Sequence, residues 1–214
     1  MPNPVSIAII LVFLSLAPFI AIMITSFVKI VVVLSLIRNA LGVQQIPPNM
    51  VLNGIAIILT IYIMAPVYQD SFDILHKENI SVKDLESKEI FNKLQKSVGP
   101  IKNFLNKHSH KMEKMFFVNS AKSIWSKEKA EKLKEDDLII LIPAFVVSEL
   151  TIAFKIGFML YLPFIAIDLI VSNILLAMGM MMVSPMTIST PFKLLLFVML
   201  DGWARLVHGI VLTY

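Results

Sequence analysis

The chain has 214 residues, 57% of them hydrophobic, and its mean hydropathy is +0.80. A soluble domain has about 45–50% apolar residues, so this composition indicates a membrane protein. The net charge of +4 is too small and too dispersed to indicate nucleic-acid binding, and the lack of cysteine excludes disulfides and thiolate metal sites.

Charged residues are concentrated in one segment of the chain. Residues 69–137 carry 26 of the 34 Lys, Arg, Asp and Glu residues. We therefore expect an all-α, membrane-associated fold in three parts. An N-terminal apolar helical hairpin covers 1–68, a small polar helical insert covers 69–137, and C-terminal apolar helices with a methionine loop cover 138–214.

The first apolar run covers residues 5–37. As one straight helix it would span about 50 Å, against a hydrocarbon core of about 30 Å, so it must tilt, kink at Pro18 or extend beyond the bilayer. No Lys or Arg precedes it, unlike a signal peptide, and we expect it to be a retained first helix. A polar connector at 38–49 and a second apolar run at 50–68 complete the expected hairpin.

The polar insert has the spacing of amphipathic helices. One expected helix, ended by Gly99-Pro100, has an apolar face made of Leu85, Phe91, Leu94 and Val98. A second apolar face is made of Ile101, Phe104, Leu105, Met112, Met115 and Phe116. A third helix is expected from Ser120 to about Lys134. Together these helices would form a small subdomain in water.

The C-terminal block holds two apolar runs, at 138–177 and 191–212. Pro143 and Pro163 lie inside the first run, which favours a broken hairpin over one straight span. The expected architecture is thus two long, partly broken helical hairpins that flank the insert.

Between these two runs lies the segment Met178-Gly179-Met180-Met181-Met182-Val183-Ser184-Pro185. Successive helical residues point about 100° apart, so three consecutive methionines cannot share one helical face, and we expect a loop that presents several thioethers together. Methionine is flexible and polarisable, which suits a surface that must seal against changing shapes. Ordinary packing at a helix end is the alternative.

Six charges lie within or beside the C-terminal apolar segments: Glu149, Lys155, Asp168, Lys193, Asp201 and Arg205. An isolated charge there costs about 2.5–3.5 kcal/mol on insertion scales, so such residues pair or face water. Pairing between subunits, pairing within the chain and a proton relay are the three possible roles. Asp201 and Arg205, four residues apart, have the spacing of a pair within one helix.

Nothing in the sequence indicates an enzyme. There is no phosphate-binding Gly-rich motif and no Gly-x-Ser-x-Gly. His108 and His110 lack an evident third metal ligand. We therefore expect no catalytic residues, no metal and no cofactor.

Several motifs together resemble the FliP/SctR family, core subunits of the export gate in flagellar and virulence type III secretion systems. They are Pro143–Leu150, Asp168–Ser172 with the methionine loop, Pro191–Val198 with Asp201-Gly202-Trp203, Arg38–Gly42, and Asn53-Gly54. The resemblance covers both apolar blocks, about two thirds of the chain, and favours the injectisome branch.

The resemblance implies a function. Such a chain forms a homopentameric ring with a small two-helix subunit and a larger single-copy subunit in the bacterial inner membrane. The ring conducts unfolded substrates out of the cytoplasm, and the 69–137 insert lies in the periplasm. Of the three possible roles for the six charges above, we expect pairing between subunits of such a ring. The resemblance also implies a pore gasket made of Met178, Met180, Met181 and Met182. A small-molecule or ion transporter that uses the membrane charges is the alternative, and the oligomeric state distinguishes the two.

Overall fold

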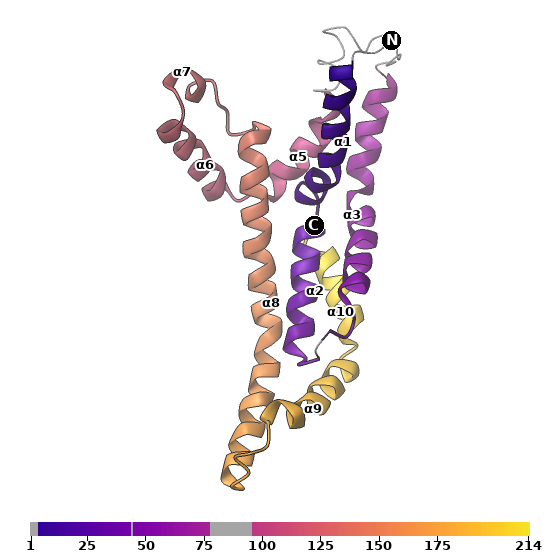
Figure 1. The fold of residues 1–214 in the computed structure, drawn as a ribbon, viewed down its shortest axis with the longest axis vertical. Helices are drawn as coiled ribbons and strands as arrows, with labels where there is room; N and C mark the ends of the chain where they lie inside the picture. The colour runs from indigo at the N-terminus through magenta and orange to yellow at the C-terminus, as the bar shows by residue number, and fades with distance from the viewer. Residues whose placement is uncertain (1–3, 44, 78–95) are drawn as a thin grey trace. The chain divides into compact units, whose positions relative to one another are not determined.

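The computed structural model describes residues 4–43, 45–77 and 96–214. Every regular element in these ranges is a helix, which confirms the all-α prediction (Figure 1). In chain order the helices are α1 (Pro4–Met23), α2 (Phe27–Ala40), α3 (Asn49–Lys77), α5 (Gly99–His108), α6 (Lys111–Ile124), α7 (Lys127–Ala130), α8 (Leu138–Ala177), α9 (Pro185–Met199) and α10 (Gly202–Val211).

The chain divides into two compact units. One combines Met1–Val28 with Ile61–Glu149, and the other combines Lys29–Thr60 with Leu150–Tyr214. The long helices α3 and α8 contribute residues to both units. The methionine loop and five of the six predicted charges belong to the second unit, and Glu149 belongs to the first.

The first apolar run breaks between α1 and α2, at residues 24–26, and Pro18 lies inside α1. The Thr25 hydroxyl donates a hydrogen bond to the Ile22 carbonyl at 3.3 Å. Short hydroxyl side chains compete in this way with the backbone hydrogen bonds of a helix. The break therefore follows the polar pair Thr25-Ser26 rather than the proline.

The run 138–177 forms one continuous helix, α8, of 40 residues (Figure 1). At 1.5 Å per residue it is about 60 Å long. The prediction of a broken hairpin at Pro143 and Pro163 was wrong. A proline removes one backbone hydrogen bond, but in apolar surroundings the remaining backbone groups have no other partner, so the helix continues past it.

In the C-terminal block it is the final apolar segment, not α8, that breaks. Helices α9 and α10 meet at an angle of 62°, and Asp201 between them has a left-handed backbone, with φ of 50°. By length and composition α3 and α8 can each cross a membrane, and the bent α9–α10 pair would make a third span among the described residues.

The first unit has a core where α5 packs against the start of α8. The rings of Phe104 and Phe145 lie 5.7 Å apart between centroids, and both residues are buried. The backbone N–H of His110 donates to the Ser148 hydroxyl at 2.9 Å. These contacts join the insert to the first turns of α8.

The apolar face predicted over 101–116 is divided between two helices. Phe104 and Leu105 on α5 are buried, whereas Met112 and Phe116 on α6 are 77% and 59% exposed. Ser120 lies inside α6, so the prediction that it begins a third helix was wrong. Leu85, Phe91 and Leu94, which we predicted on one helical face, lie outside the described residues.

In the second unit the core forms around one face of α2, whose buried apolar residues are Ile30, Val33, Leu34, Ile37 and Ala40. Gly157 on α8 faces Leu36 at close range. A Cβ atom added to Gly157 would overlap Leu36 Cδ1 and would lie 3.1 Å from its Cβ. The missing side chain is therefore what allows α2 and α8 to approach.

Gly157→Ala should destabilise the protein, because Leu36 cannot move both its end and its Cβ out of the way. Overpacking of this kind costs about 1–3 kcal/mol. The measurement is the thermal unfolding midpoint in mild detergent. Gly54→Ala is the matched control, since its Cβ would meet nothing within 4 Å. There alanine should raise helix stability by up to about 1 kcal/mol. Equal midpoints for the two variants would contradict the close approach.

Candidate functional site

The methionine loop, residues 178–184, connects the end of α8 to the start of α9. Its first turn is held by two backbone hydrogen bonds, from Met180 N–H to the Leu175 carbonyl at 2.9 Å and from Gly179 N–H to the Leu176 carbonyl at 3.0 Å. This is the Schellman arrangement, which requires a left-handed residue directly after the helix. Gly179 supplies it with φ of 74°. Pro185, suited to the first turn of a helix, starts α9.

The loop presents its methionines to the outside of the chain. Met178 and Met180 are 58% and 44% exposed, and Met181 and Met182 are 81% and 100% exposed. The prediction that these residues form a loop displaying several thioethers is confirmed, because none of them lies in α8 or α9. Their proposed role as a pore gasket stays a prediction.

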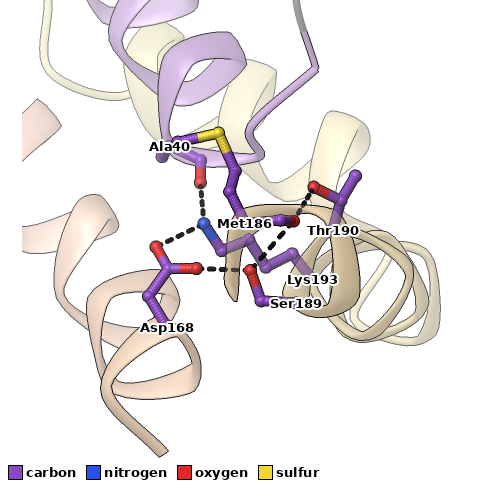
Figure 2. Close-up of polar contacts among 6 residues, drawn as sticks. All are labelled: Ala40, Asp168, Met186, Ser189, Thr190 and Lys193. Carbon is purple, nitrogen blue, oxygen red and sulfur yellow. Dashed lines mark hydrogen bonds and ion pairs between the residues drawn. The ribbon is translucent and has the colours of Figure 1, made fainter. Parts of the chain in front are cut away.

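A buried lysine lies in α9, the helix that follows the loop. The Lys193 ammonium donates hydrogen bonds to two acceptors, the Asp168 carboxylate at 2.6 Å and the Ala40 carbonyl at 3.2 Å. Its side chain is 2% exposed, and that of Asp168 is 34% exposed. Figure 2 shows the ammonium between these two oxygens. The lysine thus connects α9 to α8 and to the end of α2.

The second oxygen of Asp168 also has a partner. The Ser189 hydroxyl donates to it at 2.5 Å (Figure 2). Ser189 lies one helical turn before Lys193, so both donors reach the carboxylate from the same face of α9. Asp168 therefore receives one charged and one neutral hydrogen bond from α9. We call Lys193, Asp168, Ser189 and the Ala40 carbonyl the lysine clasp.

The connector after α2 fits closely against the clasp. Gly42 has φ of 72°, and a Cβ atom there would lie 3.2 Å from the Thr190 hydroxyl and 3.8 Å from Lys193 Nζ. Arg38, on the last turn of α2, donates to Asn49 Oδ1 at 2.6 Å and to the Pro47 carbonyl at 3.2 Å. These bonds hold the two ends of the connector together.

The other four predicted charges are not drawn into the clasp. Glu149 is fully buried in the first unit, whereas Lys155, Asp201 and Arg205 are exposed on the isolated chain. Among the residues that the structure describes, no ion pair joins Asp201 to Arg205. Arg205 lines a largely apolar pocket beside the α9–α10 bend. Pairing of these charges between subunits stays a prediction.

Sequence reasoning missed two members of this polar interior. Ser189 was not singled out, although its position four residues before Lys193 was the available signal. Lys29 was noted only as an interruption of the first apolar run. It is 1% exposed, and its ammonium lies 3.5 Å from the centroid of the Tyr214 ring. A lone lysine inside an apolar run is itself a sign of a buried, partnered cation.

Within the described ranges, the histidines have no group of further metal ligands beside them. The His108 ring lies 4.7 Å from the Phe104 ring, and His208 is exposed on α10. Over residues 4–43, 45–77 and 96–214, no group of three or more His, Cys, Asp or Glu residues is placed to hold a metal ion.

The clasp predicts unequal costs for losing its two charges. Asp168→Asn leaves a buried ammonium that water cannot reach, whereas Lys193→Met leaves a carboxylate that is one third exposed. Removing one partner of a buried pair costs about 3–5 kcal/mol. We expect Asp168→Asn to lower the thermal unfolding midpoint more than Lys193→Met does.

The control for this comparison is a surface pair in the first unit. Lys102 and Asp136 lie 3.1 Å apart with side chains 33% and 59% exposed, and the hydrogen bond from Lys102 lowers the pKa of Asp136. Surface pairs contribute about 0–1 kcal/mol. If Asp168→Asn is no more damaging than Asp136→Asn, the clasp is not the buried pair described here.

Comparison with known proteins gives the family. The profile of the FliP family matches residues 10–210. The chain is 57% identical over 214 residues to the Yop proteins translocation protein R of Yersinia pestis. The matched region covers all of this chain and 98% of that protein. The chain is 50% identical to the hypersensitivity response secretion protein HrcR of Ralstonia nicotianae, over 98% of this chain and 96% of that protein. It is 48% identical to the virulence protein YscR of Salmonella typhimurium, over 94% of this chain and 92% of that protein. The methionine loop and the lysine clasp are therefore features of a chain that belongs to the FliP family.

Proposed function

We propose that this chain is a pore-forming core subunit of a type III protein-export gate, in which the methionine loop seals the channel. The observation that carries the proposal is the loop itself. Its backbone is fixed at both ends, while four thioethers in five positions extend away from the chain. Relatives named for translocation and secretion proteins support the same conclusion.

A seal of this kind works by excluding water. A hydrophobic constriction stops ions by dewetting, so the backbone itself does not have to close the channel. Flexible thioethers re-pack around side chains of different shapes, so an unfolded chain can pass through them. Several copies of Met180, Met181 and Met182 around one axis would combine both properties.

Assembly into a ring would cover apolar surface that the isolated chain exposes. On α8, four large apolar side chains are 48–70% exposed: Phe154, Phe158, Met159 and Leu162. Lys155 lies among them and Arg205 lies beside an apolar pocket. We propose that these surfaces contact neighbouring copies, the small two-helix subunit and the larger single-copy subunit. The exposed charges Lys155, Asp201 and Arg205 would take part in pairing between subunits, whereas Glu149 is buried within its own chain. The clasp pair Lys193–Asp168 would then stabilise each copy.

The proposed location is the bacterial inner membrane, with the 69–137 insert in the periplasm. Helices α3 and α8, which are long and apolar enough to cross a membrane, support the membrane location. The charged surface of the insert suits water on either side. Its periplasmic side rests on the resemblance to the family.

Replacing Met180, Met181 and Met182 by alanine should open the seal. The shorter side chains no longer reach the axis, while Gly179 and Pro185 still fix the loop. We expect the complex to assemble normally but to conduct ions in a planar bilayer, where the unmodified complex is silent. Secretion of substrates should be reduced less strongly than the ability of the membrane to hold back ions.

The matched control replaces three exposed methionines that lie outside the loop and outside the proposed contact surfaces, Met23, Met50 and Met199, which are 46–85% exposed. This variant should remain as silent as the unmodified complex. A silent triple-alanine loop variant in a correctly assembled complex would place the seal elsewhere.

The exposed half of the α6 face predicts a contact between inserts. Phe116 is 59% exposed on α6, next to Met112 and Met115. Phe116→Ser should leave the isolated chain as stable as before but weaken the ring, since only the ring covers this face. Native mass spectrometry of the purified complex gives the fraction of intact rings.

The comparison variant is Phe104→Ser, because Phe104 is 8% exposed and packs on Phe145 within the chain. Its loss should unfold the insert itself, since removing a buried phenylalanine side chain costs about 3–5 kcal/mol. If Phe116→Ser leaves the rings intact, the proposed contact between inserts through α6 is wrong. If the unmodified chain forms only monomers, the result would favour the alternative function, a small-molecule or ion transporter.

A further inference from the structure

Other methionines of the chain, such as Met50 at 85%, are also exposed, but the methionine loop gathers four exposed thioethers within five positions, and Met182 is fully exposed. We propose that the loop is a reversible oxidation site, at which a hydroperoxide converts its methionines to methionine sulfoxide and thereby opens the seal. The inference rests on the proposed function, because it assigns a form of regulation to the same loop.

The exposure of the methionine side chains makes the loop accessible to an oxidant. Met182 is 100% exposed and Met181 is 81% exposed, whereas Met64 on α3 is 0% exposed in the same chain. Oxidation requires contact between the sulfur and the oxidant, and susceptibility therefore follows exposure. Hydrogen peroxide has only two heavy atoms and would reach the loop from either side of a closed channel.

The lack of cysteine and the clustering of methionines also favour oxidation at the loop. The chain has 13 methionines and no cysteine, so no thiol of its own competes for the oxidant. Four of the methionines occupy positions 178, 180, 181 and 182. A low dose of oxidant can therefore modify several neighbouring groups of one loop. In a ring, each copy would add its own set.

The chemistry is a two-electron oxygen transfer. The sulfur lone pair attacks one oxygen of hydrogen peroxide, an S–O bond forms and the O–O bond breaks. The transferred oxygen gives its proton to the departing hydroxide, which leaves as water. The thioether is oxidised and the peroxide is reduced. Methionine sulfoxide reductases reverse the change, one enzyme for each sulfoxide epimer.

The physical consequence follows from the anchoring of the loop. Oxidation turns a flexible apolar side chain into a polar one. The hydrogen bonds at Gly179 and the lysine clasp involve no sulfur atom, so the backbone stays where it is while its surface becomes wettable. A constriction that excludes ions by dewetting then fills with water and conducts.

The test uses the purified export-gate complex in a planar bilayer, treated with dilute hydrogen peroxide. Peptide mapping by mass spectrometry follows the gain of oxygen at each methionine, and conductance is recorded on the same sample. We expect oxygen at Met181 and Met182 well before Met64. Conductance should rise to that of the triple-alanine loop variant and return to baseline after treatment with both reductases.

The decisive control replaces all four loop methionines, Met178, Met180, Met181 and Met182, by leucine, which conserves volume and keeps the surface apolar but has no sulfur to oxidise. Whatever its conductance before treatment, this complex should show no rise in conductance after peroxide. If the leucine variant opens with peroxide, the responsive sulfur lies elsewhere and the inference is wrong. If the loop is oxidised without a change in conductance while the triple-alanine variant leaks, the inference fails and the proposed function stands. If neither conducts, the proposed seal fails as well.

Discussion

Burial of the Lys193 ammonium is the constraint on which the second unit depends. A charge that is 2% exposed must find its hydrogen-bond partners inside the protein, because an unpaired buried charge costs several kcal/mol. The partners come from distant parts of the chain: Asp168 on α8 and the carbonyl of Ala40 at the end of α2. Satisfying one ammonium therefore fixes three helices with respect to one another, including the two that flank the methionine loop.

This constraint separates the rigid part of the site from the adaptable part. Backbone bonds at Gly179 and the start of α9 at Pro185 hold the ends of the loop. The methionine side chains make up the adaptable part, since they are exposed and have three rotatable bonds each. A protein-export seal needs this division, because the opening must stay in place while its lining changes shape.

Local physical chemistry explains which features could be predicted from the sequence. Three successive methionines before a proline predicted a loop, because a helix would point them in different directions. Prolines were a poorer guide: α8 continues through Pro163, whereas the first run breaks at Thr25-Ser26. The sequence also marked Lys193 and Asp168 as charges in apolar segments but left their partners open. The choice between a partner in the same chain and one in another depends on tertiary packing, which no local pattern reports.

The proposed function requires the methionine loop of each copy to face a shared channel. Because the chain has no cysteine, a single Met182→Cys substitution places one thiol at the most exposed position of the loop. A short bismaleimide added to the purified complex should then link neighbouring copies through this residue, whereas a cysteine at Met50, 85% exposed on α3, should give far fewer links. Equal linking at both positions, or none at Met182→Cys in an intact ring, would contradict the account.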